Sequence, residues 1–109
     1  MLERPLRIEE KDLLQYLINL LPNKQNTYVV PESVIDLDDG GMGSIRFGAV
    51  KQRKFGKDLI QVKYTDADKT PVIITLIEDD QQNLFELEIW KVDFSKLKQY
   101  PTQDKIVLL

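Results

Sequence analysis

Two short clusters of carboxylates are the residues of this chain whose types and spacing are best suited to chemistry. Asp36, Asp38 and Asp39 fall within the stretch DLDDGGMGS, and residues 78–80 form the run EDD. Carboxylate oxygens are the ligands that hard cations such as Ca²⁺ and Mg²⁺ prefer. Brought together, the two clusters would form a cation site or a negative patch that mimics nucleic-acid phosphate.

The spacing of the first cluster does not fit a calcium loop of the EF-hand type. Such a loop needs acidic or amide residues at its first, third and fifth positions and a glutamate at its twelfth. A loop that starts at Asp36 has Gly40 at its fifth position and Phe47 at its twelfth. A phosphate-binding loop is also excluded, because no Gly-Lys-Ser or Gly-Lys-Thr follows and a strand, not a helix, is predicted next.

The dipeptide Asp39-Gly40 is typical of a hairpin turn, since both residues tolerate the positive φ angles that such turns require. We therefore expect residues 38–43 to connect two strands. The alternative is a contact loop in which Met42, Asp38 and Asp39 meet a partner.

The two acidic clusters fall in the first and the fourth of four successive turns between predicted strands. Successive turns of a simple meander alternate between the two ends of the sheet. We therefore expect the clusters at opposite ends, and we do not expect a joint metal site.

The connection KQRKFGK places Lys51, Arg53, Lys54 and Lys57 around Phe55. Basic residues around an aromatic ring can bind single-stranded nucleic acid by phosphate pairing and base stacking. A solvated hairpin loop is the commoner structure for such a segment. The formal net charge of -3 also argues against a nucleic-acid partner.

One face of the predicted sheet gathers a tryptophan and several charges. Strand alternation places Arg46, Lys63, Glu86, Glu88 and Trp90 on the outer face. Tryptophan and arginine are enriched at the energetic centres of binding surfaces, so this face is a candidate for partner binding. The alternative is ordinary cross-strand packing, with Lys63 paired to a glutamate and Trp90 covered by the C-terminal segment.

The chain has no cysteine and no histidine. Disulfides, thiolate metal sites and the Ser-His and Cys-His nucleophile systems are therefore excluded. Carboxylates, lysines, tyrosines and hydroxyls are what remain for catalysis. We expect no cofactor, and we do not expect an enzyme.

The length of 109 residues is that of one domain, so we expect a single domain over residues 1–109. No apolar run approaches the roughly 18 residues that span a membrane. The N-terminal stretch MLERPLRIEEKD lacks the apolar core of a signal peptide. A cytoplasmic location without membrane contact is the expectation.

The leucines of EEKDLLQYLINLLP recur at helical spacing, which predicts a helix over residues 9–21 that ends before Pro22. The pattern then changes to a period of two, which predicts strands. The five predicted runs are residues 28–37, 44–50, 58–64, 71–77 and 84–92.

These elements predict an α+β fold, in which one N-terminal helix packs on an antiparallel meander of about five strands. Residues 93–101 are expected to form a short helix or turn. Residues 101–109 are either a loose tail or an edge strand. Open sheet edges permit pairing between chains, and the sequence leaves monomer and homodimer equally open.

The tripeptide RPL at residues 4–6, the following EE, the leucine-rich helix and the stretch DDGGMGSIRF form one pattern. This pattern resembles that of a small uncharacterised bacterial domain family, and the resemblance covers most of the chain. It implies a bacterial single-domain protein and carries no established activity.

Taken together, the residues favour a non-catalytic protein-interaction module of an immunity or regulatory type. Its candidate contacts are Arg46, Glu86, Glu88 and Trp90 on the sheet and Asp38, Asp39 and Met42 in the loop. The alternative is a binder of a small ligand or divalent cation, or an enzyme that uses Asp36, Asp38 or Glu88.

Overall fold

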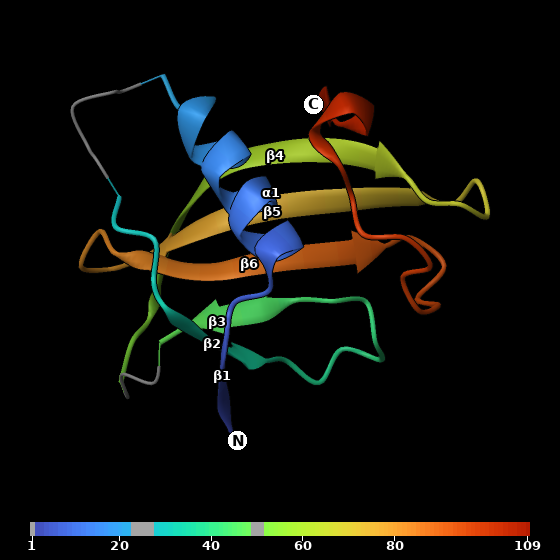
Figure 1. The fold of residues 1–109 in the computed structure, drawn as a ribbon. Helices are drawn as coiled ribbons and strands as arrows, with labels where there is room; N and C mark the ends of the chain where they lie inside the picture. Colours follow the sequence, from blue (N-terminus) through green and yellow to red (C-terminus); the bar gives the residue numbers. More distant parts are fainter. Residues whose placement is uncertain (1, 23–27, 49–51) are drawn as a thin grey trace.

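The computed structural model describes residues 2–22, 28–48 and 52–109. One α-helix lies across one face of a curved antiparallel sheet (Figure 1). This arrangement confirms the predicted α+β class. The elements are β1 (Glu3–Pro5), α1 (Ile8–Asn19), β2 (Ser33–Asp36), β3 (Ile45–Phe47), β4 (Phe55–Thr65), β5 (Pro71–Asp79), β6 (Leu84–Lys91), the 3-10 turn η1 (Gln103–Lys105) and β7 (Val107–Leu108).

The sheet has seven strands in the order β1-β2-β3-β6-β5-β4-β7, rather than about five. Each of the five predicted runs overlaps one strand, and the two additional strands are the short edge strands β1 and β7. The tail therefore contributes an edge strand, which pairs with Val62 and Lys63 of β4. Runs of two or three residues are too short to show a strand period, which is why the sequence pattern did not reveal them.

The expected simple meander is wrong at one connection. Strand β3 pairs with β6, through Ile45↔Leu87 and Arg46↔Glu86, and not with β4. The chain before β4 instead passes the ends of β5 and β6, where the Asp80 N–H donates to the Lys54 carbonyl. Alternation specifies which face a side chain takes, whereas the choice of neighbouring strand depends on long-range contacts.

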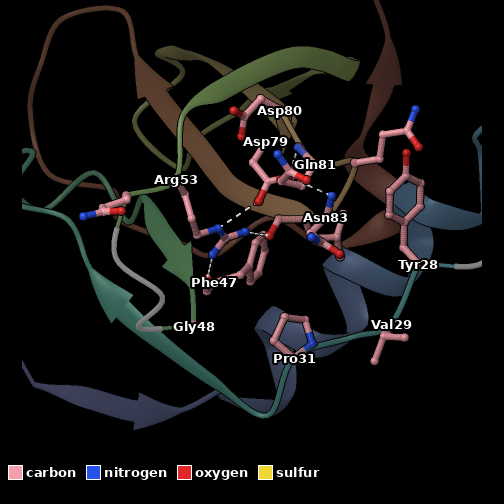
Figure 2. Close-up of a pocket in the computed structure, with 13 residues that line it drawn as sticks. Tyr28, Val29, Pro31, Phe47, Gly48, Arg53, Asp79, Asp80, Gln81 and Asn83 are labelled. Atoms are coloured by element: carbon pink, nitrogen blue, oxygen red, sulfur yellow. Dashed lines mark hydrogen bonds and ion pairs between the residues drawn. The ribbon is translucent and has the colours of Figure 1, made fainter.

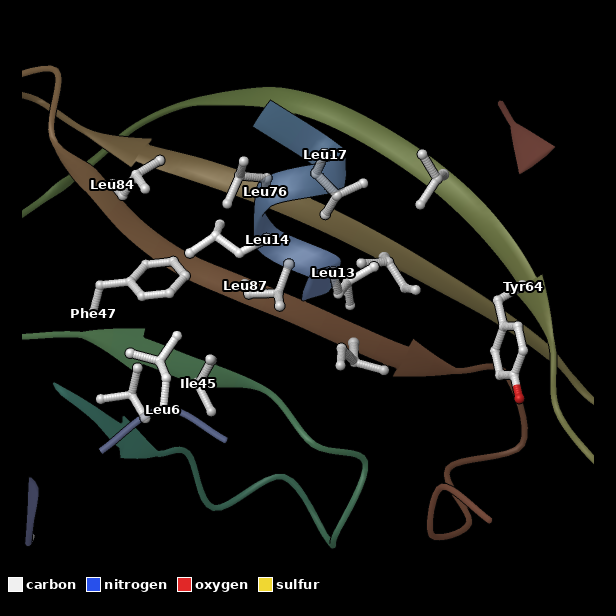
Figure 3. Packing of buried hydrophobic residues seen from close by; sticks show 14 of the residues in the cluster. Leu6, Leu13, Leu14, Leu17, Ile45, Phe47, Tyr64, Leu76, Leu84 and Leu87 are labelled. Atoms are coloured by element: carbon white, nitrogen blue, oxygen red, sulfur yellow. The ribbon is translucent and has the colours of Figure 1, made fainter. Parts of the chain in front are cut away.

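Helix α1 packs its leucine stripe on the sheet. Leu13, Leu14 and Leu17 are buried and lie over Leu76 of β5 and Leu87 of β6 (Figure 3). The predicted helix began one residue later and ended two residues later than the observed Ile8–Asn19. The described helix is too short and too polar to cross a membrane.

A buried ion pair holds the chain that follows β6. The Lys91 ammonium lies 2.8 Å from the Asp66 carboxylate and 2.7 Å from the Asp68 carboxylate. Both aspartates lie in the turn between β4 and β5. The Asp66 carboxylate also accepts hydrogen bonds from the backbone N–H groups of Lys98 and Gln99. These hydrogen bonds fix residues 93–101 as a turn followed by extended chain. The helical turn lies later in the sequence, at η1.

Candidate functional site

The face of the sheet opposite α1 carries the four strand residues predicted for partner binding, whereas the other three lie in the loop after β2. Along β6, Leu87 and Ile89 point to the helix side and are fully buried, whereas Glu86, Glu88 and Trp90 alternate to the outer side. The only α-helix in the described ranges lies on the other side of the sheet, over the leucine core. The outer side chains therefore form a surface, which we call the outer face.

Strand register determines which residues are neighbours on the outer face. Trp90 is opposite Ile73, which is opposite Lys63 on β4. Glu88 is opposite Thr75, one row along. Directly opposite residues of antiparallel strands point to the same side, so these five side chains share the face.

The third row contains the ion pair of the outer face. Glu86 lies opposite Arg46 on β3, and the Arg46 Nε donates to the Glu86 carboxylate at 2.9 Å. The Arg46 guanidinium also lies over the Phe85 ring, 4.9 Å from its centroid. The alternative pair between Lys63 and a glutamate is not formed among the described residues, because β5 separates β4 from β6.

Glu88 has no ion-pair partner among the side chains of the described residues. Its pKa is raised above the ordinary value, first by burial and then by the negative charges of Glu86 and Asp58. Asp58 lies on the same face, opposite Ile77. The centre of the outer face therefore carries uncompensated negative charge.

Trp90 and Phe94 form an exposed aromatic pair that the sequence did not reveal. Trp90 is 41% exposed and Phe94 is 68% exposed, and their ring centroids are 6.3 Å apart. Phe94 has a φ of +63°, a left-handed conformation that costs a residue with a Cβ roughly 1–2 kcal/mol. The only sequence signal for Phe94 is its position after the turn residue Asp93, which specifies neither its exposure nor its backbone.

The glycine-rich loop after β2 is a wide hairpin turn. The Asp39 carboxylate accepts hydrogen bonds from the N–H groups of Met42 at 3.1 Å and Ser44 at 2.9 Å. The hydrogen bond from the Leu37 N–H to the Ser44 carbonyl closes the turn, so residues 38–43 connect β2 to β3 as expected. Asp39 thus holds the loop, while Asp38 is exposed.

Met42 points inward and not to the surface. It is 8% exposed, and its sulfur accepts a hydrogen bond from the Lys91 N–H at 3.3 Å. A partner that binds this loop would therefore meet Asp38 and the glycine backbone before it meets the Met42 side chain.

Asp36 belongs to a hydrogen-bond network that ties the N-terminus to the sheet. All five N–H donors of the Arg4 guanidinium are used, by Asp36, Glu10 and the Pro5 carbonyl. The Glu10 carboxylate also accepts a hydrogen bond from the Arg7 N–H, and this hydrogen bond caps the start of α1. The RPL and EE residues of the sequence pattern therefore meet in space and have a structural role.

Two residues of the second acidic cluster pair with two residues of the basic run. Asp79 accepts a hydrogen bond from the Arg53 Nε at 2.9 Å, and Lys57 lies 3.7 Å from Glu78. Lys51 lies outside the described residues. Two of the four basic residues of this connection, Arg53 and Lys57, are therefore paired with carboxylates of the protein itself.

The two acidic clusters lie at opposite ends of β6. The first loop reaches the end of β6 through the contact between Met42 and Lys91, while residues 80–83 precede its start. Within residues 2–22, 28–48 and 52–109, no three acidic side chains come together as a metal site would require.

A cleft of about 500 Å³ opens beside the Arg53 pair (Figure 2). Arg53 donates to Asp79 and to the carbonyls of Phe47 and Leu84, so its guanidinium is occupied by the protein. The remaining lining is formed by the segment at Tyr28 and by amide and carboxylate side chains of the β5–β6 turn. The cleft has the polar groups to orient a small ligand.

Comparison with known families finds one match, which covers most of the chain. Residues 3–101 match the model of a family described as "Domain of unknown function (DUF6984)". The matched range includes the Arg4 network, the glycine-rich loop and the outer face. The comparison with curated proteins gave no match, and neither did the comparison with solved structures. The chain therefore belongs to the DUF6984 family of domains of unknown function.

Proposed function

We propose that this protein is a non-catalytic protein-interaction module, of an immunity or regulatory type, that binds its partner on the outer face around Trp90. The observation that carries the proposal is the exposed pair of Trp90 and Phe94 on a face that α1 leaves open. A bacterial origin and a cytoplasmic location are part of the same proposal.

The energetics of Phe94 support a binding role. A left-handed backbone under a bulky side chain costs free energy, and a largely exposed ring recovers little of that cost from burial. Such strain is common where a side chain must be presented for function. The Asp93 carboxylate stabilises the turn by accepting a hydrogen bond from the Ser95 N–H at 3.0 Å.

The rigidity of the surface also supports the proposal. Trp90 sits on a central strand, and the next residue, Lys91, is anchored in the buried ion pair with Asp66. A preorganised aromatic anchor loses little conformational freedom when it binds. Truncation of such an anchor typically costs about 2 kcal/mol or more of binding free energy.

Site-specific photo-crosslinking in the source cells tests the proposal. A photoreactive phenylalanine analogue at Lys63, on the outer face, should give one discrete adduct, and the Trp90→Ala substitution should abolish it. The same analogue at Lys11, an exposed position of α1, is the matched control and should give none. Adducts of equal yield from both positions, or an adduct that survives Trp90→Ala, would contradict the outer face as the binding surface.

The cleft beside Arg53 supports one alternative, the binding of a small ligand or a divalent cation. A ligand that binds only the folded state raises the melting temperature. A thermal-shift screen with magnesium, calcium, manganese and common nucleotides should therefore show a positive shift if this alternative holds. A shift that persists in Asp80→Ala, at the rim of the cleft, would place the ligand elsewhere.

A further inference from the structure

We infer that the partner presents a basic segment, and that an arginine or lysine of this segment binds between Trp90 and Glu88. The inference rests on the proposed function and adds the chemistry of the partner. It is carried by a motif of one aromatic ring and one carboxylate that occurs twice on β6. In the first copy the two residues are adjacent and bind an arginine, and in the second they are two residues apart and bind none within the described residues.

The complete copy of the motif is formed by Phe85, Glu86 and Arg46. The Arg46 guanidinium stacks on the Phe85 ring at 4.9 Å and donates to the neighbouring Glu86 carboxylate. Arginine suits both contacts, because its planar group stacks on an aromatic face while its edge N–H groups reach a carboxylate.

The open copy of the motif is formed by Trp90 and Glu88. These residues are two apart on the same strand and face the same side, so about 7 Å separates their positions along the strand. Trp90 offers an indole, the aromatic ring that binds cations best. Glu88 offers a carboxylate with no ion-pair partner in the described part of the chain. The cation that completes the first copy is absent from the second.

The end of β3 explains why the second copy is open. The β3–β6 ladder covers only Leu87 and Glu86, so Arg46 reaches the first copy and no residue of β3 is paired with Glu88 or Trp90. The next residue towards them, Ser44, is small, and its hydroxyl is hydrogen-bonded to the Ile89 backbone. A side chain of the partner can therefore bind to Trp90 and Glu88 in the way that Arg46 binds to Phe85 and Glu86.

Electrostatics favour a cation at this position. Asp58, Glu86 and Glu88 share the outer face, and Arg46 compensates only Glu86. Lys63 lies on the same face but is separated from Trp90 by Ile73. The net charge of -3 for the whole chain adds a weaker long-range attraction for a basic partner.

Trp90 itself provides the test, because it is the only tryptophan of the chain and its fluorescence reports this site alone. The probes are two short peptides of equal length, one of alternating arginine and leucine and one of alternating glutamate and leucine. The basic peptide should change the Trp90 emission, with an affinity that falls as salt is added. The acidic peptide should leave the emission unchanged.

Two substitutions, one that reverses the charge and one that removes it, test the role of Glu88. Glu88→Lys removes an attraction and adds a repulsion, so it should weaken binding of the basic peptide about tenfold. Glu88→Gln, which only removes the attraction, should weaken it about two- to fivefold. Glu32→Lys makes the same change of net charge at an exposed residue outside the outer face and is the control, with unchanged binding expected.

Three outcomes would overturn the inference. The first is that Trp90 emission does not respond to the basic peptide up to about 1 mM, a concentration at which even weak specific binding is detected. The others are equal binding of the two peptides and unchanged binding of the basic peptide by Glu88→Lys. If the cross-link at Lys63 still forms and still requires Trp90, the interaction module stands and only the basic partner is refuted. If the basic peptide binds as expected and no cross-link forms in cells, the inference about the site chemistry stands and the proposed function fails.

Discussion

Replacement of Arg4 by methionine should destabilise the fold strongly at neutral pH and much less in acid. The guanidinium joins β1, α1 and β2, and its removal leaves the Glu10 carboxylate with only the Arg7 N–H as a hydrogen-bond donor. Glu10 is 1% exposed, so water cannot replace the lost partner. Methionine retains most of the apolar stem of arginine, which limits the loss of packing.

The structure sets the magnitude of the loss. Breaking a buried ion pair by removing one partner costs about 3–5 kcal/mol. The contact with Asp36 adds at most about 1 kcal/mol, since that carboxylate is largely exposed. For a domain of this length, the free energy of unfolding should fall by about 3–5 kcal/mol and the melting temperature by more than about 10 °C.

The pH dependence identifies Glu10 as the cause. Burial raises the pKa of Glu10, and the hydrogen bonds from Arg4 and Arg7 lower it by more, so the folded-state pKa lies below the ordinary 4.5. This interaction stabilises the native protein above pH 4.5 and is lost as the pH falls through the folded-state value. In Arg4→Met, burial dominates and raises the pKa, so the variant loses stability as the pH rises. The difference between the two proteins should therefore be largest near neutrality and should shrink as the pH falls below 4.5.

Urea denaturation followed by circular dichroism at several pH values measures this difference. Lys11→Met, which removes an exposed cation from the same helix, is the control and should change stability by less than about 0.5 kcal/mol. The double variant Arg4→Met with Glu10→Gln should recover part of the loss at neutral pH. A loss below about 1 kcal/mol, or a loss that does not depend on pH, would refute the reasoning.

Three further measurements test other parts of the structure. Gly56→Ala should prevent stable folding, because the added Cβ would overlap the Asp79 carbonyl. Gly40→Ala has open space around the added Cβ and should lower the free energy of unfolding by only about 1–2 kcal/mol, the cost of its left-handed backbone. Urea denaturation of both variants compares the two losses. Burial and a hydrogen bond to a carboxylate raise the pKa of Tyr28 to about 12, so stability should fall as the pH rises above 10, and Tyr28→Phe should reduce that fall in an alkaline denaturation series. Phe94→Asn should leave the melting temperature unchanged or higher, since asparagine tolerates a positive φ, while the cross-link at the outer face is lost.

Local patterns predicted the elements and the faces of this protein well. The leucine spacing located α1, and the alternation of apolar and polar residues placed Glu86, Glu88 and Trp90 on the outer side of β6. Turn chemistry also identified the glycine-rich loop, where three glycines have positive φ. These features depend on residues close in sequence, so their physical causes are visible in the pattern itself.

The residues that only the structure brought together are those whose partners are distant in the chain. Arg46 could not be assigned to Glu86 without knowing that β3 joins β6, and Asp36 could not be distinguished from a metal ligand without its contact to Arg4. Phe94 was missed because its exposure depends on a turn that the buried Lys91 holds in place.

The sequence by itself determined the α+β class, the amphipathic helix and the absence of histidine and cysteine chemistry, because composition and periodicity follow directly from the order of residues. Only the tertiary structure decided the strand order and the pairing of charges, and therefore that Glu88 has no ion-pair partner among the described residues. Hydrogen bonds and ion pairs between strands join residues about 30 to 40 positions apart, and no local preference specifies such a partner. The open site at Glu88 and Trp90 is a consequence of where β3 ends against β6.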